Sequence, residues 1–271
     1  MTTPPVVLTI AGSDSGAGAG LQADLKTFAA LRVFGTCAVT ALTAQNTVAV
    51  RGVQPVPADF VLAQIEAVLD DFDVRAVKTG LLATAATIEL VADLAADGRL
   101  PNLVVDPVMV ASSGDRLLDR DAERLYVERL FPRARVVTPN LREAGVLQGT
   151  RLRTLADQRE AARKLAALGP VVVVKGGHAV ADHADVAIDV VALDQERDVV
   201  ELSAPRLDTP HNHGSGCSFA SAIAVGLATG RSDRDAVVGA KAFIHGAIAG
   251  GADWNLGTGH GPLDHFGWEN R

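Results

Sequence analysis

The stretch Asp208-Thr-Pro-His-Asn-His-Gly-Ser-Gly-Cys217 is followed at once by a run of small and apolar residues, 218–225. This run predicts a helix at 218–229, preceded by a turn in which Gly214 and Gly216 let the backbone expose N–H groups. The N–H groups in the first turn of a helix lack intrahelical partners, and the helix dipole adds partial positive charge there. The turn is therefore a candidate anion site, although an ordinary loop-to-helix turn would have the same residues.

Cys217 lies in the first turn of this predicted helix, where the pKa of a thiol is typically lowered. A proton acceptor inside an anion site is typical of phosphoryl transfer to a hydroxyl group. The second cysteine, Cys37, lies on an apolar predicted strand, and we expect it to belong to the core.

Composition excludes several classes of protein. The 271 residues suit a single large α/β domain over 1–271, and the net charge of −7 without a basic cluster argues against nucleic acid or an anionic membrane as partner. No apolar stretch is long enough to span a bilayer, and we expect no signal peptide. Two cysteines imply no disulfide framework, so a cytoplasmic protein is expected.

Strands alternate with helices along the chain. In the helix expected at 59–70, Phe60, Ile65 and Leu69 are expected to face inward. Short antiparallel strands are expected at 186–193 and 198–202. Strands that alternate with helices and are apolar throughout favour a mostly parallel sheet covered by helices on both faces. The main apolar strands are predicted at 6–10, 36–45, 74–78, 103–106, 135–138 and 171–175.

Polar side chains end or directly follow six of the predicted strands. In open parallel sheets, ligands bind beyond the carboxyl ends of the strands. Six polar groups in equivalent positions are more than packing requires, so we expect a binding site at this rim. The residues are Asp14, Gln45, Lys78, Asp106, Asn140 and Lys175.

Two common nucleotide motifs are disfavoured. Residues 18–23 match a GxGxxA fingerprint, but no Asp or Glu occurs between Asp24 and Asp59 to hold a ribose, which makes a nicotinamide-dependent enzyme improbable. The chain also has no GxxxxGK[ST] sequence and is therefore not a P-loop protein.

Individual rim residues suggest a ligand chemistry, each with a structural alternative. The carboxamide of Gln45 could pair with the ring nitrogen and amino group of an aminopyrimidine, or could bond the next loop. Asp106 and Glu143 suit Mg²⁺, although Glu143 also has the spacing of a capping partner for Asn140. Lys175 could meet a phosphate, or could be a solvated lysine at a strand end.

Eight ordered motifs together resemble the hydroxymethylpyrimidine/phosphomethylpyrimidine kinases of thiamine biosynthesis, in the ribokinase-like superfamily. They run from the first strand to the C-terminus. They are Ala-Gly-Ser-Asp at 11–14, Gly-Leu-Gln-Ala-Asp-Leu-Lys-Thr at 20–27, Thr-Ala-Gln-Asn at 43–46, Asp-Pro-Val-Met-Val at 106–110, Thr-Pro-Asn-Leu-Arg-Glu-Ala at 138–144, Lys-Gly-Gly-His at 175–178, His-Gly-Ser-Gly-Cys at 213–217 and Gly-His-Gly-Pro-Leu-Asp-His-Phe at 259–266.

The resemblance implies a single ribokinase-like α/β domain, usually dimeric, with a small-molecule pyrimidine and ATP as its partners. It implies Mg-ATP-dependent phosphorylation of 4-amino-5-hydroxymethyl-2-methylpyrimidine and then of its monophosphate. A pyridoxal or pyridoxine kinase, and a non-catalytic pyrimidine-binding sensor, are the alternatives.

The resemblance also implies roles for single residues. This chain departs from the family pattern in the loop at 15–20, at Leu81, where Met is usual, and at Ser215, where Thr is usual. Leu81 nearly keeps the volume of the usual Met, and Ser215 keeps the hydroxyl of the usual Thr. Cys217 would be the base. The implied groups are Gln45, Gly12, Asp24, Leu81 and Val108 for the pyrimidine, Gly214, Ser215, Gly216 and Cys217 for the anion hole, Asp106 and Glu143 for the metal, and Lys175, Thr209 and Asn140 for the nucleotide.

Overall fold

The computed structural model describes residues 3–109, 120–177, 185–193 and 199–268. Val110 and His178, which belong to the motifs quoted above, and Asp198, where the last strand was expected to begin, lie outside these ranges. Within them a nine-stranded sheet has the order β3-β2-β1-β4-β5-β6-β7-β8-β9. The strands are β1 Val6–Asp14, β2 Phe34–Gln45, β3 Val50–Pro55, β4 Val74–Thr79, β5 Val104–Val105, β6 Val136–Val137, β7 Val171–Val174, β8 Val186–Ala192 and β9 Val199–Pro205.

The sheet is parallel in its centre and antiparallel at both ends. Strands β2, β1, β4, β5, β6 and β7 pair in parallel, whereas β3 runs antiparallel to β2. At the other end β8 and β9 form the expected antiparallel pair. The predicted fold class, an α/β protein with a mostly parallel sheet, is confirmed.

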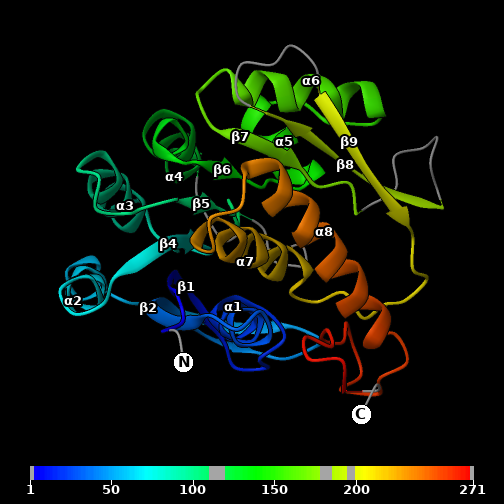
Figure 1. The fold of residues 1–271 in the computed structure, drawn as a ribbon, viewed down its shortest axis with the longest axis horizontal. Coiled ribbons are helices and arrows are strands. Elements are labelled where there is room, and N and C mark those ends of the chain that lie inside the picture. The colour runs from blue at the N-terminus through cyan, green and yellow to red at the C-terminus, as the bar shows by residue number, and fades with distance from the viewer. Residues whose placement is uncertain (1–2, 110–119, 178–184, 194–198, 269–271) are drawn as a thin grey trace.

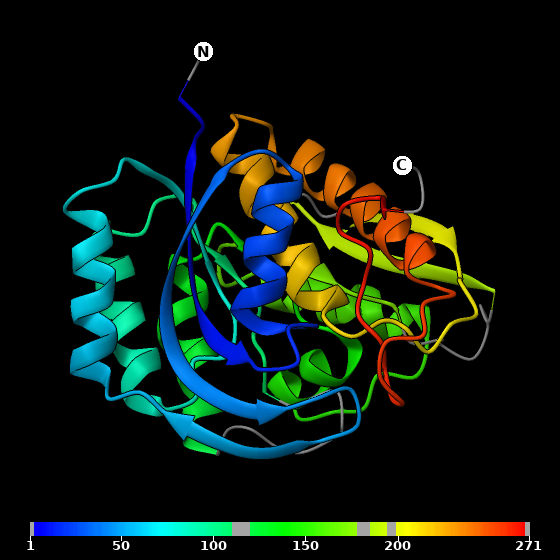
Figure 2. The ribbon, with the colours of Figure 1, turned by 90° about the horizontal axis from the view of Figure 1, so that it is seen from below.

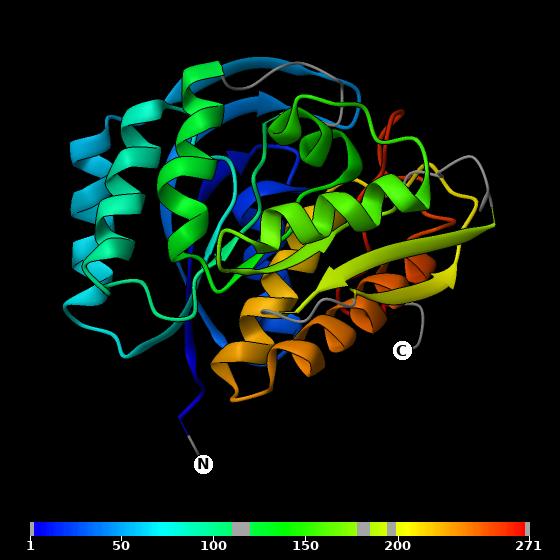
Figure 3. The ribbon, with the colours of Figure 1, turned by 90° about the horizontal axis from the view of Figure 1, so that it is seen from above.

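Helices cover both faces of the sheet, as the apolar strands predicted. Neighbouring valines on one strand face opposite layers: Val104 packs with α1, α7 and α8, and Val105 packs with α2 to α6. Figure 2 shows the first layer in front of the sheet, and Figure 3, from the opposite side, brings the green helices of the second layer forward. The helices are α1 Gly20–Ala30, α2 Ala58–Leu69, α3 Ala85–Ala96, α4 Arg120–Leu125, α5 Leu141–Gln148, α6 Leu155–Ala166, α7 Ser215–Ala228 and α8 Asp233–Gly250, with a π-helical turn at Tyr126–Leu130 and a 3₁₀ turn at Phe131–Arg133.

Two sequence-based expectations about the core were wrong. Phe60 is 62% exposed, because the buried stripe of α2 is formed by Val61 and Ile65, one helical turn apart. Cys37 on β2 is half-buried and is not a core residue.

The order of the strands creates the site. From β1 the chain passes to β2 on one side, and β4 lies on the other side of β1 (Figure 1), so the carboxyl ends of β1 and β4 meet at a topological switch point. Helix α7 is buried along almost its whole length and begins at Ser215, earlier than the sequence predicted. No helix in the described ranges is both long and apolar enough to cross a membrane.

Candidate active site

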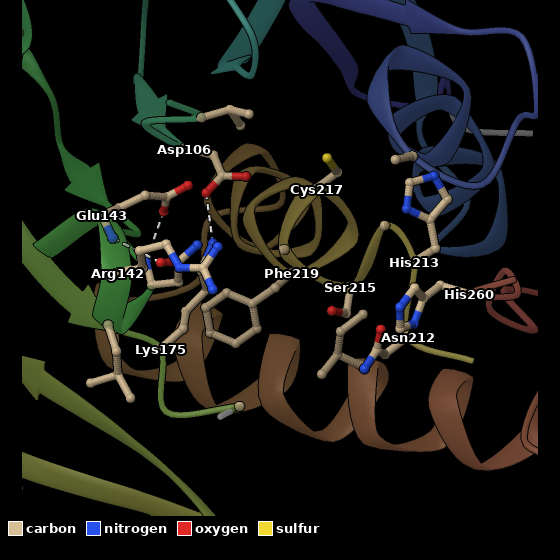
Figure 4. A pocket seen from close by; sticks show the side chains of 18 of the residues that line it. Asp106, Arg142, Glu143, Lys175, Asn212, His213, Ser215, Cys217, Phe219 and His260 are labelled. Atoms are coloured by element: carbon tan, nitrogen blue, oxygen red, sulfur yellow. Dashed lines mark hydrogen bonds and ion pairs between the residues drawn. The ribbon is translucent and has the colours of Figure 1, made fainter. Parts of the chain in front are cut away.

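A cavity of about 1120 Å³ opens at the carboxyl ends of the parallel strands. All of the predicted site residues except Asp24 line it. Figure 4 shows Asp106, Glu143 and Lys175 on one side of the start of α7, His213 and His260 on the other, and Cys217 between them. The predicted residues on its wall are Gly12, Gln45, Leu81, Asp106, Val108, Asn140, Glu143, Lys175, Thr209, Gly214, Ser215, Gly216 and Cys217.

One part of the cavity wall combines a carboxamide with apolar side chains. Gln45, at the end of β2, supplies a carboxamide, while Leu81 and Val108 supply apolar surface. Gly12 lies against Leu81, because a Cβ at residue 12 would come within 3.2 Å of the leucine Cδ2. A larger residue at position 12 would therefore narrow this part of the cavity.

Asp24 lies beneath the cavity and does not line it, contrary to the sequence-based expectation. Its carboxylate accepts hydrogen bonds from Thr9 and Ser221 and forms a salt bridge with Lys78 at 2.8 Å, in which both side chains are completely buried. Lys78 does line the cavity. The sequence indicated Lys78 only as a polar strand end, because its partner is distant in the chain.

The start of α7 presents backbone N–H groups to the cavity. Gly214 caps the helix with φ +84°, and a side chain there would also overlap the carbonyl oxygen of Gly18. The Ser215 N–H donates to the carbonyl of Asn212 at 3.1 Å. Within the part of the chain that the structure describes, the N–H groups of Gly216 and Cys217 have no such partner. They remain available to an anion.

Lys175 and Asp106 face this helix end. The ammonium of Lys175 lies 2.7 Å from Oδ1 of Asp106, and Thr138 donates to the same oxygen at 3.1 Å. A Cβ at Gly216 would lie 3.1 Å from Nζ of Lys175. Burial lowers the pKa of Lys175, but Asp106 and Glu143 outweigh this effect and raise it above its usual value. The lysine therefore stays a cation beside the free N–H groups.

Glu143 combines the two roles that the sequence left open. It forms a capping box with Asn140, whose side-chain oxygen accepts from the Glu143 N–H at 2.9 Å. Its carboxyl group is also buried on the cavity wall, and burial together with the charge of Asp106 raises its pKa to about 7, against the opposite effect of Lys175. The Glu143 carboxyl group and the negatively charged Asp106 thus lie close together on the cavity wall, an arrangement that fits a divalent cation.

Cys217 departs from the expectation for a helix N-terminus. Its pKa is raised to about 11, chiefly because burial disfavours the thiolate and because Asp24 and Asp106 add negative charge. Lys78 and the N–H of Gly20 lower the pKa of this thiol, but they do not offset the burial. Resting Cys217 is therefore a neutral thiol, and the prediction of a lowered pKa was wrong.

The far end of the cavity contains residues that the sequence analysis missed. Asp189, a single carboxylate on the apolar strand β8, accepts from the Gly176 N–H and pairs with Lys241, each at 2.8 Å. Arg206 donates to the Gly177 carbonyl, while its Nε and Nη2 atoms are buried with no bond to the described residues. The unpaired guanidinium donors of Arg206 suit an anionic or nucleotide ligand.

The two other predicted nucleotide residues already have partners within the protein. The side chain of Asn140 caps α5, and the Thr209 hydroxyl donates to the carbonyl of Ala252.

The mostly parallel sheet, with a helix N-terminus, a buried lysine and two carboxylates at one rim, has the arrangement that the resemblance to ribokinase-like kinases implied. A family model described as phosphomethylpyrimidine kinase matches residues 14–264. The chain belongs to this family and is a kinase.

Relatives of known name agree with this assignment. The hydroxymethylpyrimidine/phosphomethylpyrimidine kinase of Streptomyces coelicolor is 48% identical over 98% of this chain and 96% of its own length. That of Haemophilus influenzae is 44% identical over 99% of both chains. A Staphylococcus aureus pyridoxal kinase, solved with AMP-PCP and pyridoxal, superposes with a TM-score of 0.87 at 37% identity and covers 99% of this chain and 96% of its own.

The raised pKa of Cys217 predicts a distinctive alkylation profile. In a Cys37→Ala variant, Cys217 is the only thiol, and only the thiolate reacts with iodoacetamide. We expect the rate to rise about tenfold per pH unit from about pH 7 to 10 without a plateau. The measurement is mass spectrometry of the alkylated peptide, with free cysteine as the control. A plateau below about pH 9 would contradict the raised pKa.

Proposed function

We propose that this protein transfers the γ-phosphoryl group of ATP to the hydroxymethyl oxygen of 4-amino-5-hydroxymethyl-2-methylpyrimidine and then phosphorylates the monophosphate. The proposal rests on one observation: a single cavity holds Gln45, the start of α7 with Cys217, and Lys175 with Asp106 and Glu143. The names of the relatives support the same reaction.

The Gln45 carboxamide on the cavity wall would bind the pyrimidine. A carboxamide has one acceptor and one donor side by side, which matches the amino group and adjacent nitrogen of an aminopyrimidine. Gly12, Leu81 and Val108 would contact the faces of the ring. Asp24 would act from below by holding Lys78, without touching the substrate.

The start of α7 would stabilise the transferring phosphoryl group. The free N–H groups of Gly216 and Cys217 are fixed before the reaction, and fixed donors in a site that excludes water are the main source of such stabilisation. Gly214 makes the turn and Ser215 adds a hydroxyl at the same position. Cys217 would accept the hydroxyl proton. Because it rests as a thiol, it must first release its own proton to water in the open cavity, and the charge of the Lys78 ammonium favours the thiolate that remains.

The nucleotide would occupy the part of the cavity between Lys175 and Arg206, with Thr209 and Asn140 on the adjoining wall. The pyridoxal kinase that superposes on this chain was solved with a nucleotide analogue, which supports ATP as phosphoryl donor. Asp106 and Glu143 would hold Mg²⁺, which supplies positive charge to the phosphates when it is bound.

A pyridoxal kinase is the second candidate, because the superposed structure is one. Pyridoxal lacks the amino group beside a ring nitrogen, so the two substrates differ in what they require of Gln45. The closer sequence identity to the pyrimidine kinases favours the first candidate.

We also propose a cytoplasmic homodimer. Strand β3 is an edge of the described sheet, and the β2–β3 hairpin exposes Leu42, Val48 and Val53. An exposed apolar patch on an open edge favours association with a second copy. The two free cysteines suit a reducing compartment.

An ADP-release assay with three acceptors tests the proposed reaction. We expect higher kcat/KM for the hydroxymethylpyrimidine and its monophosphate than for pyridoxal. Gln45→Leu should raise the KM for the pyrimidine about tenfold and affect pyridoxal less, because only the pyrimidine uses both ends of the amide. Asn255→Leu, which replaces an exposed amide outside the cavity, is the control. The proposal is wrong if pyridoxal is the best acceptor or if no acceptor releases ADP.

The metal site is tested by Asp106→Asn and Glu143→Gln. Each should raise the Mg²⁺ concentration for half-maximal ADP release about tenfold, because a carboxylate ligand is lost. The KM for the pyrimidine should stay within about threefold. Glu128→Gln, an exposed glutamate on the π-helical turn, is the control. Unchanged Mg²⁺ dependence in both variants would remove these residues from the metal site.

A further inference from the structure

Four polar side chains meet in the cavity wall beside the pyrimidine end. Nε2 of His213 lies 3.0 Å from Oδ2 of Asp14 and 3.2 Å from the amide nitrogen of Gln45. The amide oxygen of Gln45 lies 3.4 Å from Oγ1 of Thr43. The two ends of a carboxamide have the same shape, so the surrounding hydrogen atoms decide which end faces which neighbour.

Asp14 is an anion. Its carboxylate accepts from the N–H groups of Gly16, Gly18 and Ala19 at 2.8, 3.1 and 2.8 Å, so the loop after β1 wraps around it. Burial alone would raise the pKa of Asp14, but the hydrogen bonds from His213, Ala19 and Gly16 hold it below its usual value. An ionised carboxylate only accepts hydrogen bonds.

His213 must therefore carry a hydrogen on Nε2. A bare nitrogen 3.0 Å from the Asp14 carboxylate would set two lone pairs against each other, whereas an N–H donates to it. With that hydrogen in place, an amide NH₂ of Gln45 at 3.2 Å would set a donor against a donor. The amide oxygen is the end of Gln45 that Nε2–H can share.

The hydrogen bonds of Thr43 independently indicate the same orientation of the Gln45 carboxamide. Its hydroxyl has one hydrogen, and this hydrogen is donated to the carbonyl of Ser13 at 2.9 Å. Oγ1 is then an acceptor and cannot donate to the amide oxygen of Gln45. An amide NH₂ facing Oγ1 satisfies both groups.

We propose that His213 is a positioning residue that, together with Thr43, sets the Gln45 carboxamide with its oxygen toward His213 and its NH₂ toward Thr43. One lone pair and one N–H then remain for a ligand, with the acceptor on the His213 side. If the ligand is the aminopyrimidine of the proposed function, this arrangement places the amino group of the pyrimidine nearest His213 and its ring nitrogen nearest Thr43.

The packing around His213 holds its ring in this place. His213 is buried, with 7% of its surface exposed, and its backbone N–H donates to the carbonyl of Gly261 at 3.1 Å. A Cβ at Gly18 would overlap Cδ2 of the ring. Gly18 is therefore required for the histidine to reach both Asp14 and Gln45.

A double-mutant cycle tests the positioning role. His213→Leu should raise the KM for the hydroxymethylpyrimidine about tenfold with kcat and the KM for ATP within about threefold, and His213→Gln, which keeps an N–H donor near the Nε2 position, should restore most of the loss. In a Gln45→Leu background, His213→Leu should add little, because it acts through Gln45. Additive effects, or a fall in kcat alone, would overturn the proposal.

Imidazole ¹⁵N NMR of the unliganded wild-type protein tests the hydrogen positions without any substrate. We expect His213 to carry hydrogen on Nε2, and the Gln45 NH₂ signals to shift in Thr43→Val. A His213 neutral ring with bare Nε2 would overturn the proposal. If the protein does not phosphorylate the pyrimidine, the proposed function fails, yet the NMR result still decides the orientation of Gln45.

Discussion

The close approach of two glycine turns is the constraint on which the site depends. Gly214 sits against the carbonyl of Gly18, and a side chain at Gly18 would displace the ring of His213. This contact joins the loop after β1 to the start of α7, two segments from opposite ends of the chain. As a result the carboxamide at the end of β2 and the thiol of α7 share one cavity. Without the contact, the substrate end and the phosphoryl-transfer end would be separate surfaces.

Two buried ion pairs flank the start of α7 and set its electrostatics. Lys78 pairs with Asp24, and Lys175 pairs with Asp106. Buried pairs of this kind contribute little to stability, because both charges lose their hydration. Their effect here is local: Lys78 favours the thiolate of Cys217, while the two aspartates oppose it. If Asp106 holds the metal as proposed, binding of the metal–nucleotide complex would change this balance and would couple the chemistry of the thiol to nucleotide binding.

Local patterns in the sequence predicted the fold and several polar residues of the cavity wall, whereas Leu81, Val108 and Thr209 were implied only by the family resemblance. Apolar runs identified the strands, and the topology of parallel sheets brought Gln45, Asp106 and Lys175 to one rim. The errors at Asp24 and Cys217 arise from contacts between residues that are distant in the sequence, whereas the error at Phe60 concerns which face of α2 is buried. The family resemblance implied that Asp24 lines the pocket, whereas its salt bridge with the distant Lys78 lies beneath the cavity. The pKa of Cys217 was misjudged because burial by other elements outweighs the effect of the helix end. The pair of Asp14 and His213, separated by 199 residues, has no local signature.

The central step of the proposed reaction is the transfer of the proton from the acceptor hydroxyl to Cys217. Steady-state kinetics of Cys217→Ala with the hydroxymethylpyrimidine test it most directly. The account predicts a kcat lower by a factor of about 100 to 10,000. It also predicts a KM for the pyrimidine within about threefold of the wild type, because the ring contacts lie elsewhere in the cavity. Turnover comparable to that of the wild type would contradict it.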